Sequence, residues 1–218
     1  MAWSYSALDS FETCPRRHNL IKITKQVVEP QSDALAWGSK VHKALELRLV
    51  DSVPLPPEMA TYEPIAAGIV AKAAGGTLQA EQKVALTSSY TPTAFFAKNV
   101  WVRGITDFDI EKGKKLFIGD WKTGKVNVSS GQMRLMAAMG LAARPWVEEV
   151  TTAFIWLNSG EVTAEKFTRA DAPGIWQTFL PRVQRLESAA VTKDYPPKPS
   201  GLCNRWCPVP RDMCEHRG

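Results

Sequence analysis

The stretch L-F-I-G-D-W-K-T-G-K, residues Leu116–Lys125, joins a short apolar run directly to an acid and a base. Side chains alternate between the two faces of a strand, so Asp120 and Lys122 point to one face and Trp121 to the other. Such a pair either forms a surface ion pair, worth under about 1 kcal/mol, or belongs to a site that binds a metal and a substrate. The residues before it bear on this choice.

A hairpin turn is predicted just upstream, at Gly113-Lys114, because a glycine in the first position of a two-residue loop suits a type II′ turn. This register places Asp107 directly opposite Asp120 on the neighbouring strand. A three-residue turn with a glycine bulge is the competing register, and it moves the two carboxylates apart. Opposed carboxylates repel each other unless a cation lies between them. Together with Lys122 they suit a hard cation with oxygen ligands, Mg²⁺ or Mn²⁺.

The composition is that of a soluble globular protein, with 218 residues, 44% apolar and 22% charged. No apolar run approaches the roughly 18 residues that span a bilayer, and the N-terminus lacks the basic and apolar regions of a secretion signal. We therefore expect a cytoplasmic protein with no membrane partner, whose four cysteines do not form disulfides. The net charge of +5, from 27 basic and 22 acidic residues, favours a polyanionic partner.

Hydrophobic periodicity and turn residues divide the chain into helices and strands. The expected helices are 4–26 (interrupted near Cys14-Pro15), 34–50, 65–74, 132–144 and 171–191. The expected strands are 81–89, 94–102, 104–110, 114–122, 150–157 and 161–167. This succession predicts an α/β or α+β domain in which helices flank a central mixed sheet.

Several motifs occur in a recognisable order along the chain. They are G-I-T-D (104–107), I-G-D-W-K (118–122) and Gln132 on the following helix, preceded by Gly38 and His42 in W-G-S-K-V-H. The opening S-Y-S-A-L-D-S-F-E-T-C-P-R-R-H precedes them all. This set resembles the PD-(D/E)XK nuclease superfamily, and within it the RecB-type branch, which implies a restriction-endonuclease-like core over nearly the whole chain.

The resemblance also implies roles for individual residues. It assigns the metal to four ligands: His42, Asp107, Asp120 and the carbonyl of Trp121. Lys122 would be the catalytic lysine, Glu81 would help to position a metal or water, and Gln132 would contact a DNA phosphate or the lysine. One departure is Met136, which stands where the branch has a tyrosine.

The cysteines are confined to the two ends of the chain, as Cys14, Cys203, Cys207 and Cys214. Thiolates clustered in an aperiodic tail indicate a metal site, and their spacing fits either zinc or a [4Fe–4S] cluster. The arrangement is similar to that of the iron–sulfur nucleases of the AddB-type and CRISPR-associated RecB-like groups, which favours the cluster. We expect residues 1–218 to form a single domain, with 1–30 and 195–218 binding the cluster and 34–191 forming the nuclease core.

The resulting hypothesis is a metal-dependent DNA exonuclease that hydrolyses phosphodiester bonds in single-stranded DNA or at DNA ends, in a phage or CRISPR setting. Basic residues beside the expected cluster site would bind DNA phosphates: Arg16, Arg17 and Lys22. Trp37 and Trp121 would stack on unpaired bases. The alternative is a catalytically inactive nucleic-acid-binding or assembly protein on the same fold, with a zinc or iron–sulfur site.

Overall fold

The structure is a computed structural model that describes residues 2–126 and 131–217. Its contacts divide the chain into two compact units, residues 33–177 and residues 1–32 with 178–218. Within the described ranges, no helix combines the length and the apolar character needed to cross a membrane.

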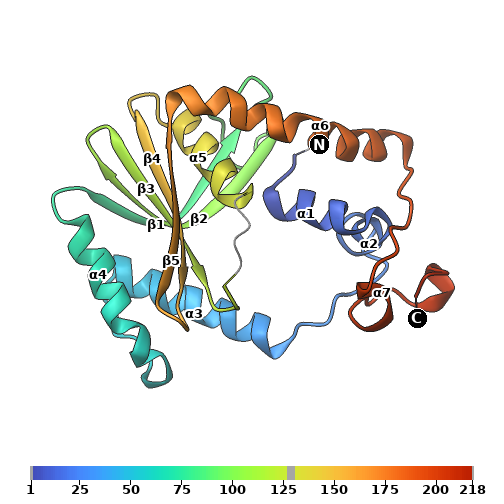
Figure 1. The fold of residues 1–218 in the computed structure, drawn as a ribbon, viewed down its shortest axis with the longest axis horizontal. Coiled ribbons are helices and arrows are strands. Elements are labelled where there is room, and N and C mark those ends of the chain that lie inside the picture. The colour runs from blue at the N-terminus through green and yellow to red at the C-terminus, as the bar shows by residue number, and fades with distance from the viewer. Residues whose placement is uncertain (1, 127–130, 218) are drawn as a thin grey trace. The chain divides into compact units, whose positions relative to one another are not determined.

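The larger unit contains a five-stranded mixed sheet, counted over the described residues (Figure 1). The strands follow one another across the sheet in chain order: β1 (Thr77–Leu86), β2 (Val102–Lys112), β3 (Lys115–Lys122), β4 (Glu149–Trp156) and β5 (Glu161–Thr168). Strands β3 and β4 are parallel, and each of the other neighbouring pairs is antiparallel. The predicted mixed sheet is therefore confirmed.

The β2–β3 hairpin has the predicted two-residue turn. Lys112 pairs with Lys115, and Gly113 adopts a positive φ of 56°. Lys114 is not among the described residues with positive φ, which matches a type II′ turn rather than type I′. The ladder ends at the pair Phe108–Gly119. Asp107 and Asp120 therefore follow at the point where the two strands part.

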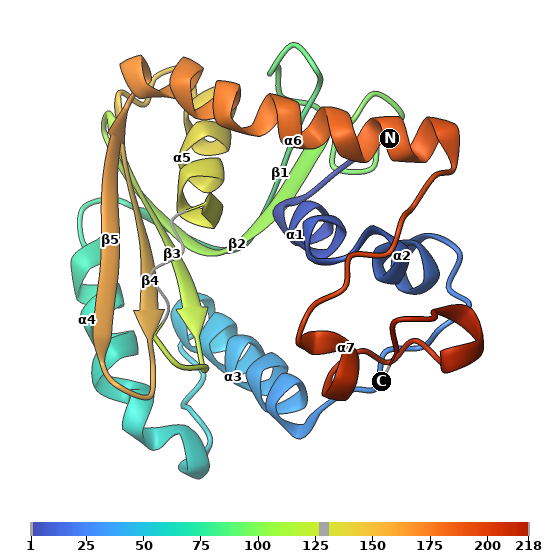
Figure 2. The same cartoon turned by 45° about the vertical axis from the view of Figure 1, so that its right-hand side comes forward.

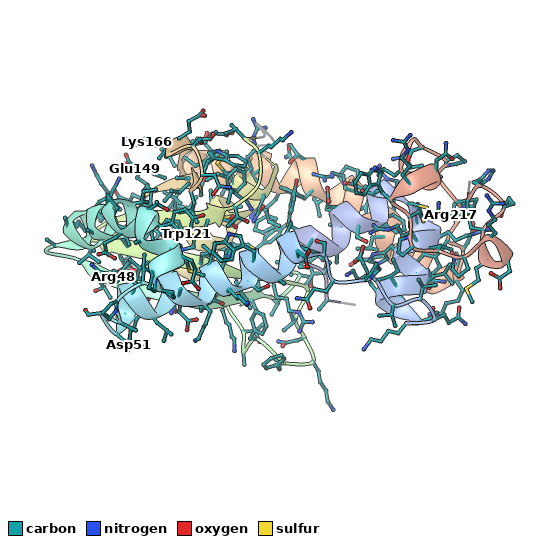
Figure 3. The ribbon with its side chains drawn as sticks, turned by 90° about the horizontal axis from the view of Figure 1, so that it is seen from below. Arg48, Asp51, Trp121, Glu149, Lys166 and Arg217 are labelled. Carbon is teal, nitrogen blue, oxygen red and sulfur yellow. The ribbon has the colours of Figure 1, made fainter. Side chains whose placement is uncertain are left out.

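Helices cover both faces of the sheet (Figure 2). Helix α5 (Gly131–Ala143) packs on one face, and α3 (Asp33–Val50) and α4 (Glu63–Ala73) pack on the other. Three residues at helical spacing on α3 are buried in a core with Phe108 and Trp121: Val41, Leu45 and Leu49. Arg48, labelled in Figure 3, joins α3 to α4 through Glu63, with Nε 2.9 Å from Oε1.

The smaller unit contains the N-terminal helices and the C-terminal tail. Ser4 caps α1 (Tyr5–Thr13) through its side chain, and Pro15 begins α2 (Pro15–His18), as the break predicted near Cys14-Pro15 requires. A π-helical segment (Asn19–Ile23) follows. Helix α6 (Ala172–Thr192) crosses the boundary between the units, and the tail contains α7 (Leu202–Arg205). Arg182 of α6 pairs with Glu12 at 2.6 and 2.9 Å.

Two strand predictions are wrong. Residues 94–101 form turns rather than a strand, because the Ala97 amide bonds back to the Ala94 carbonyl at 2.9 Å and places two phenylalanines in a turn. The apolar run there resembled a strand only in composition. Strand β1 also begins at Thr77 rather than Glu81, since its first residues pair with the end of β2.

Gly119 is required by the packing of this sheet. A Cβ added there would lie 2.0 Å from the Phe108 ring, whereas one added at Gly68, inside α4, meets nothing within 4 Å. We predict that Gly119→Ala lowers the free energy of unfolding by roughly 1–3 kcal/mol. The matched control Gly68→Ala should raise it, by up to about 1 kcal/mol. Urea denaturation of both variants measures this, and equal effects would contradict the packing account.

Candidate active site

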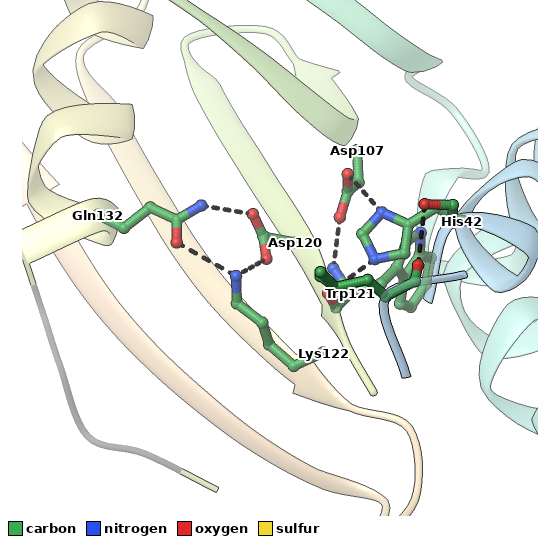
Figure 4. A network of polar contacts seen from close by, with 8 residues as sticks. His42, Asp107, Asp120, Trp121, Lys122 and Gln132 are labelled. Atoms are coloured by element: carbon green, nitrogen blue, oxygen red, sulfur yellow. Dashed lines mark hydrogen bonds and ion pairs between the residues drawn. The ribbon is translucent and has the colours of Figure 1, made fainter. Parts of the chain in front are cut away.

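Six residues from four elements form one polar network at the end of the sheet where β2 and β3 part (Figure 4). Helix α3 provides the imidazole, β2 and β3 provide the two carboxylates and the lysine, and α5 provides an amide. The residues are His42, Asp107, Asp120, Trp121, Lys122 and Gln132. The sequence-predicted metal ligands, lysine and glutamine thus lie together.

His42 bridges the two strands. Its Nδ1 lies 3.1 Å from Asp107 Oδ1 and its Nε2 lies 3.1 Å from the carbonyl oxygen of Trp121. The Trp121 amide donates to the other carboxylate oxygen of Asp107 at 2.6 Å. Because both partners of the imidazole are acceptors, the doubly protonated ring satisfies both contacts. His42 therefore links the two oxygen groups that the sequence predicts as fellow ligands.

Asp120, Lys122 and Gln132 form the second half of the network. Lys122 Nζ lies 2.5 Å from Asp120 Oδ2 and 3.2 Å from Gln132 Oε1. The Gln132 amide completes the triangle by donating to Asp120 Oδ1 at 2.7 Å. Of the two contacts expected for Gln132, the structure contains the one with the lysine. Lys122 also lies 4.5 Å from the centre of the Phe154 ring, which restricts its ammonium group to this corner.

One residue in each half of the network has a shifted pKa, Asp120 in one half and His42 in the other. Burial, together with the nearby charge of Asp107, raises the pKa of Asp120 to about 6 despite its contact with Lys122. For His42, burial acts to lower the pKa, but the hydrogen bond and charge of Asp107 outweigh it and raise the pKa overall. Both shifts follow from placing two carboxylates and few cations in a partly dry site.

An open groove of about 520 Å³ lies beside His42, between α3 and the sheet. Glu81 lines it, and burial with the charges of Asp107 and Glu46 raises the pKa of this carboxyl. Glu81 lies within β1 rather than opening a strand, and its φ of 51° interrupts the pairing with β2. Two residues that the sequence motifs do not include, Lys43 and Glu46, also line the groove. The spacing of Glu46, four residues after His42 on one helix face, is the signal that predicts it.

The candidate ligand atoms are two carboxylates, a carbonyl oxygen and one imidazole nitrogen. Oxygen-rich ligands of this kind suit a hard divalent cation. Asp120 Oδ2 is buried without a hydrogen-bond partner, apart from its ion pair with Lys122. Across residues 2–126 and 131–217, no three acidic, histidine or cysteine side chains are gathered as an ion-binding group. Asp107 is held by His42 and Asp120 by Lys122 and Gln132, so the carboxylates have separate partners.

The four cysteines line one pocket of about 150 Å³ in the smaller unit: Cys14, Cys203, Cys207 and Cys214. All are free thiols. Backbone amides point at two of the sulfurs, from Lys198 to Cys14 at 3.5 Å and from Ser200 to Cys203 at 3.4 Å. The pocket has room for several waters, more than a single ion fills.

The predicted DNA-binding basic residues already have acidic partners. Arg16 pairs with Glu215 at 2.6 Å, and Arg17 and Lys22 both contact Glu29. Their charge is therefore largely compensated within the smaller unit.

Neither predicted stacking tryptophan presents an open ring. Stacking of bases on Trp121 is excluded, because its side chain is 2% exposed and packs on Phe108. Trp37 is half-buried against the same core.

A family model described as the PD-(D/E)XK nuclease superfamily matches residues 2–215. No curated protein matches the chain. Among solved structures, one described as a putative exonuclease from Eubacterium rectale is 14% identical, with a TM-score of 0.55, over 97% of this chain and 92% of that one. This likeness shows a shared fold.

Two further solved structures are similar over most of the chain. The protein SSO0001 is 12% identical with a TM-score of 0.46, over 100% of this chain and 87% of that one. An alkaline exonuclease from Laribacter hongkongensis is 8% identical with a TM-score of 0.28, over 85% of this chain and 99% of that one. Both TM-scores are below 0.5, so neither likeness shows a shared fold.

The raised pKa of Asp120 predicts a stability that depends on pH. The folded pKa of about 6 exceeds the ordinary 3.8, so the protein loses stability as the pH rises through about 6 and the buried carboxyl ionises. In EDTA at pH 8, Asp120→Asn should raise the free energy of unfolding, by at most about 3 kcal/mol. At pH 4 the difference should nearly vanish.

Chemical denaturation across this pH range measures the effect, with Asp51→Asn at an exposed position as the control. If Asp120→Asn were less stable than the parent at pH 8, the ionised Asp120 carboxylate would not be the destabilising group that its raised pKa predicts.

Proposed function

The chain belongs to the PD-(D/E)XK nuclease superfamily, and from this premise we propose that it is a metal-dependent deoxyribonuclease that degrades single-stranded DNA or DNA ends as an exonuclease. The observation that carries the proposal is that two groups of contacts lie at one end of the sheet, His42 with Asp107 and Trp121, and Asp120 with Lys122 and Gln132, on adjacent residues of β3. A protein that only binds nucleic acid has no need of two carboxylates and a lysine at one partly dry point.

Four groups are proposed to hold the cation, either Mg²⁺ or Mn²⁺: the carboxylates of Asp107 and Asp120, the Trp121 carbonyl and His42. A cation held there would polarise the scissile phosphoryl group and lower the pKa of a bound water. His42 would hold the cation through a ring nitrogen of its neutral form, because only the neutral imidazole can coordinate.

Lys122 is proposed as the catalytic lysine. Its ammonium group is fixed by Gln132 and by the Phe154 ring, so it offers a positive charge at a set position. That charge orients a water or offsets the negative charge that develops on the phosphate in the transition state. Gln132 is a positioning residue, because it contacts both Asp120 and Lys122. Glu81 lines the groove beside His42 and is proposed to help position the metal or a water.

We further propose that the cysteine pocket binds a [4Fe–4S] cluster, with zinc as the alternative. The support is that all four thiols line one pocket, and that two of them accept amide hydrogen bonds of the kind that stabilise thiolates. The cluster would hold the N-terminal helices to the tail in a nuclease of the RecB-type branch. In this proposal the two units act as a single nuclease domain.

The nuclease proposal predicts strong losses of cleavage from single substitutions. Asp107→Ala, Asp120→Ala and Lys122→Ala should each reduce the rate by roughly 10³-fold or more, because residues that act as a unit fail together. The control is Lys115→Ala, an exposed lysine at the other end of β3. The wild-type assay compares end-labelled single strands, linear duplex and closed circular duplex, with Mg²⁺ or Mn²⁺.

Linear single strands should be cut faster than closed circles. Cleavage near the wild-type rate by Asp120→Ala would exclude the active-site assignment. Equal rates on circles and single strands would exclude the preference for ends and unpaired strands. A wild-type protein that binds DNA but cuts none of the three would favour the inactive binding protein.

The cluster proposal predicts about four iron atoms per chain in protein purified without oxygen. Replacing any of the four cysteines by serine should remove the iron and lower the melting temperature. Met213→Leu, beside Cys214, is the control and should keep the iron. Iron analysis and absorption near 400 nm measure the outcome, and stoichiometric zinc without iron would refute the cluster.

A further inference from the structure

The segment between Glu81 and Asp107, which runs from β1 through the β1–β2 connection into β2, carries positive charge without any acid. No aspartate or glutamate occurs between Glu81 and Asp107, while Lys83, Lys98 and Arg103 all lie there. The same connection, drawn as the loop between β1 and β2 in Figure 1, contains the adjacent pair Phe95-Phe96. Charge and aromatic surface are thus concentrated in one short stretch of the larger unit.

The cations and the rings are in contact. Lys83 Nζ lies 5.9 Å from the ring centres of both Phe95 and Phe96, and the Arg103 guanidinium lies 5.4 Å from the Phe95 centre. The two rings meet edge to face with centres 5.1 Å apart. We call these four residues the basic–aromatic patch: Lys83, Phe95, Phe96 and Arg103.

The patch is open to a partner. Phe96 is 78% exposed, which leaves most of one ring uncovered. Among the described residues, Lys83, Lys98 and Arg103 have no acidic partner within ion-pair distance. This differs from the smaller unit, where Arg16 and Arg17 are each compensated by a glutamate. An uncompensated cation beside an exposed ring is the combination that binds a phosphate and a base together.

The loop that presents the patch is held in place. The Trp101 amide bonds to the Leu86 carbonyl at 2.8 Å, and the Thr93 hydroxyl bonds to Asn99 Oδ1 at 2.9 Å. Tyr90 stacks on Trp176 with ring centres 4.5 Å apart and meets the edge of Trp101. The loop that carries the exposed Phe96 ring is therefore already ordered by these contacts. Binding a ligand there loses little conformational entropy of the loop.

The patch lies on the same two strands as the active site, a short distance along them. Lys83 follows Glu81 by two residues and pairs with Ile105, which precedes Asp107 by two residues. Side chains opposite each other in an antiparallel pair share a face. Ile105 is 47% exposed, so this face remains open between the patch and the network.

We propose that the basic–aromatic patch binds unpaired nucleotides of single-stranded DNA, with a base stacked on Phe96 and phosphates on Lys83 and Arg103. The strand then follows β1 and β2 toward Asp107. This inference rests on the proposed nuclease function for its ligand, but the patch lies outside the residues assigned to the chemistry.

The test is equilibrium binding of a fluorescent oligothymidylate of about 16 nucleotides, the upper range for such sites, to the full chain in EDTA. Phe96→Ala should weaken binding about 5- to 150-fold, the range for losing one stacked base. Lys83→Gln and Arg103→Gln should each reduce the slope of log K against log salt by about 0.7. Binding of a blunt duplex should change far less with Phe96→Ala, because its bases are already stacked.

Trp146→Ala is the matched aromatic control, since Trp146 is 56% exposed and bonds to Glu111 near the other end of β2. It should leave the affinity unchanged, and all variants should keep the parental melting temperature. Unchanged affinity in both Phe96→Ala and Lys83→Gln would overturn the patch, even if the wild type cleaves DNA. Loss of affinity in a protein that cleaves no DNA would instead overturn the nuclease function and keep the patch.

Discussion

Repulsion between two carboxylates at the open end of the β2–β3 hairpin is the constraint on which the larger unit depends. Asp107 and Asp120 follow the last paired residues of their strands, in surroundings dry enough to raise the pKa of Asp120 to about 6. Each needs a compensating partner, and each finds it on a different element. His42 of α3 serves one, and Lys122 with Gln132 of α5 serves the other. Both faces of the sheet thus contribute to a single point.

The ionised carboxylate of Asp120 lowers the stability of the folded protein, and the same carboxylate is a proposed metal ligand. The charge on Asp120 is only partly offset, because Lys122 supplies the single contacting ammonium while burial and Asp107 oppose ionisation. A divalent cation would relieve that imbalance by binding to the ionised form. A buried charge that is only partly compensated is typical of functional sites, where stability is not the main requirement.

Two basic segments, one in each unit, differ in whether their residues are paired with acidic residues. In the smaller one, Arg16 and Arg17 lie around the cysteine pocket but are neutralised by glutamates, so they serve cohesion there. In the larger one, Lys83 and Arg103 lie on phenylalanine rings with no acid in that stretch of the chain. A net charge of +5 is the same in either case. Only the local pairing distinguishes a basic segment that stabilises a fold from one that is free to bind phosphates.

The sequence alone narrowed the β2–β3 register to two, a two-residue turn at Gly113-Lys114 or a three-residue turn with a bulge, and the structure has the first. It also determined the mixed sheet and the helices around it, except that it predicted a false strand at 94–102 and placed the start of β1 four residues too late. Periodicity reports local structure, so these features needed no long-range information. The tertiary structure alone decided the pairing of His42 with Asp107, the burial of Trp121 and the exposure of Phe96. Burial and ion pairing depend on segments far apart in the chain, and no local pattern encodes which of them meet.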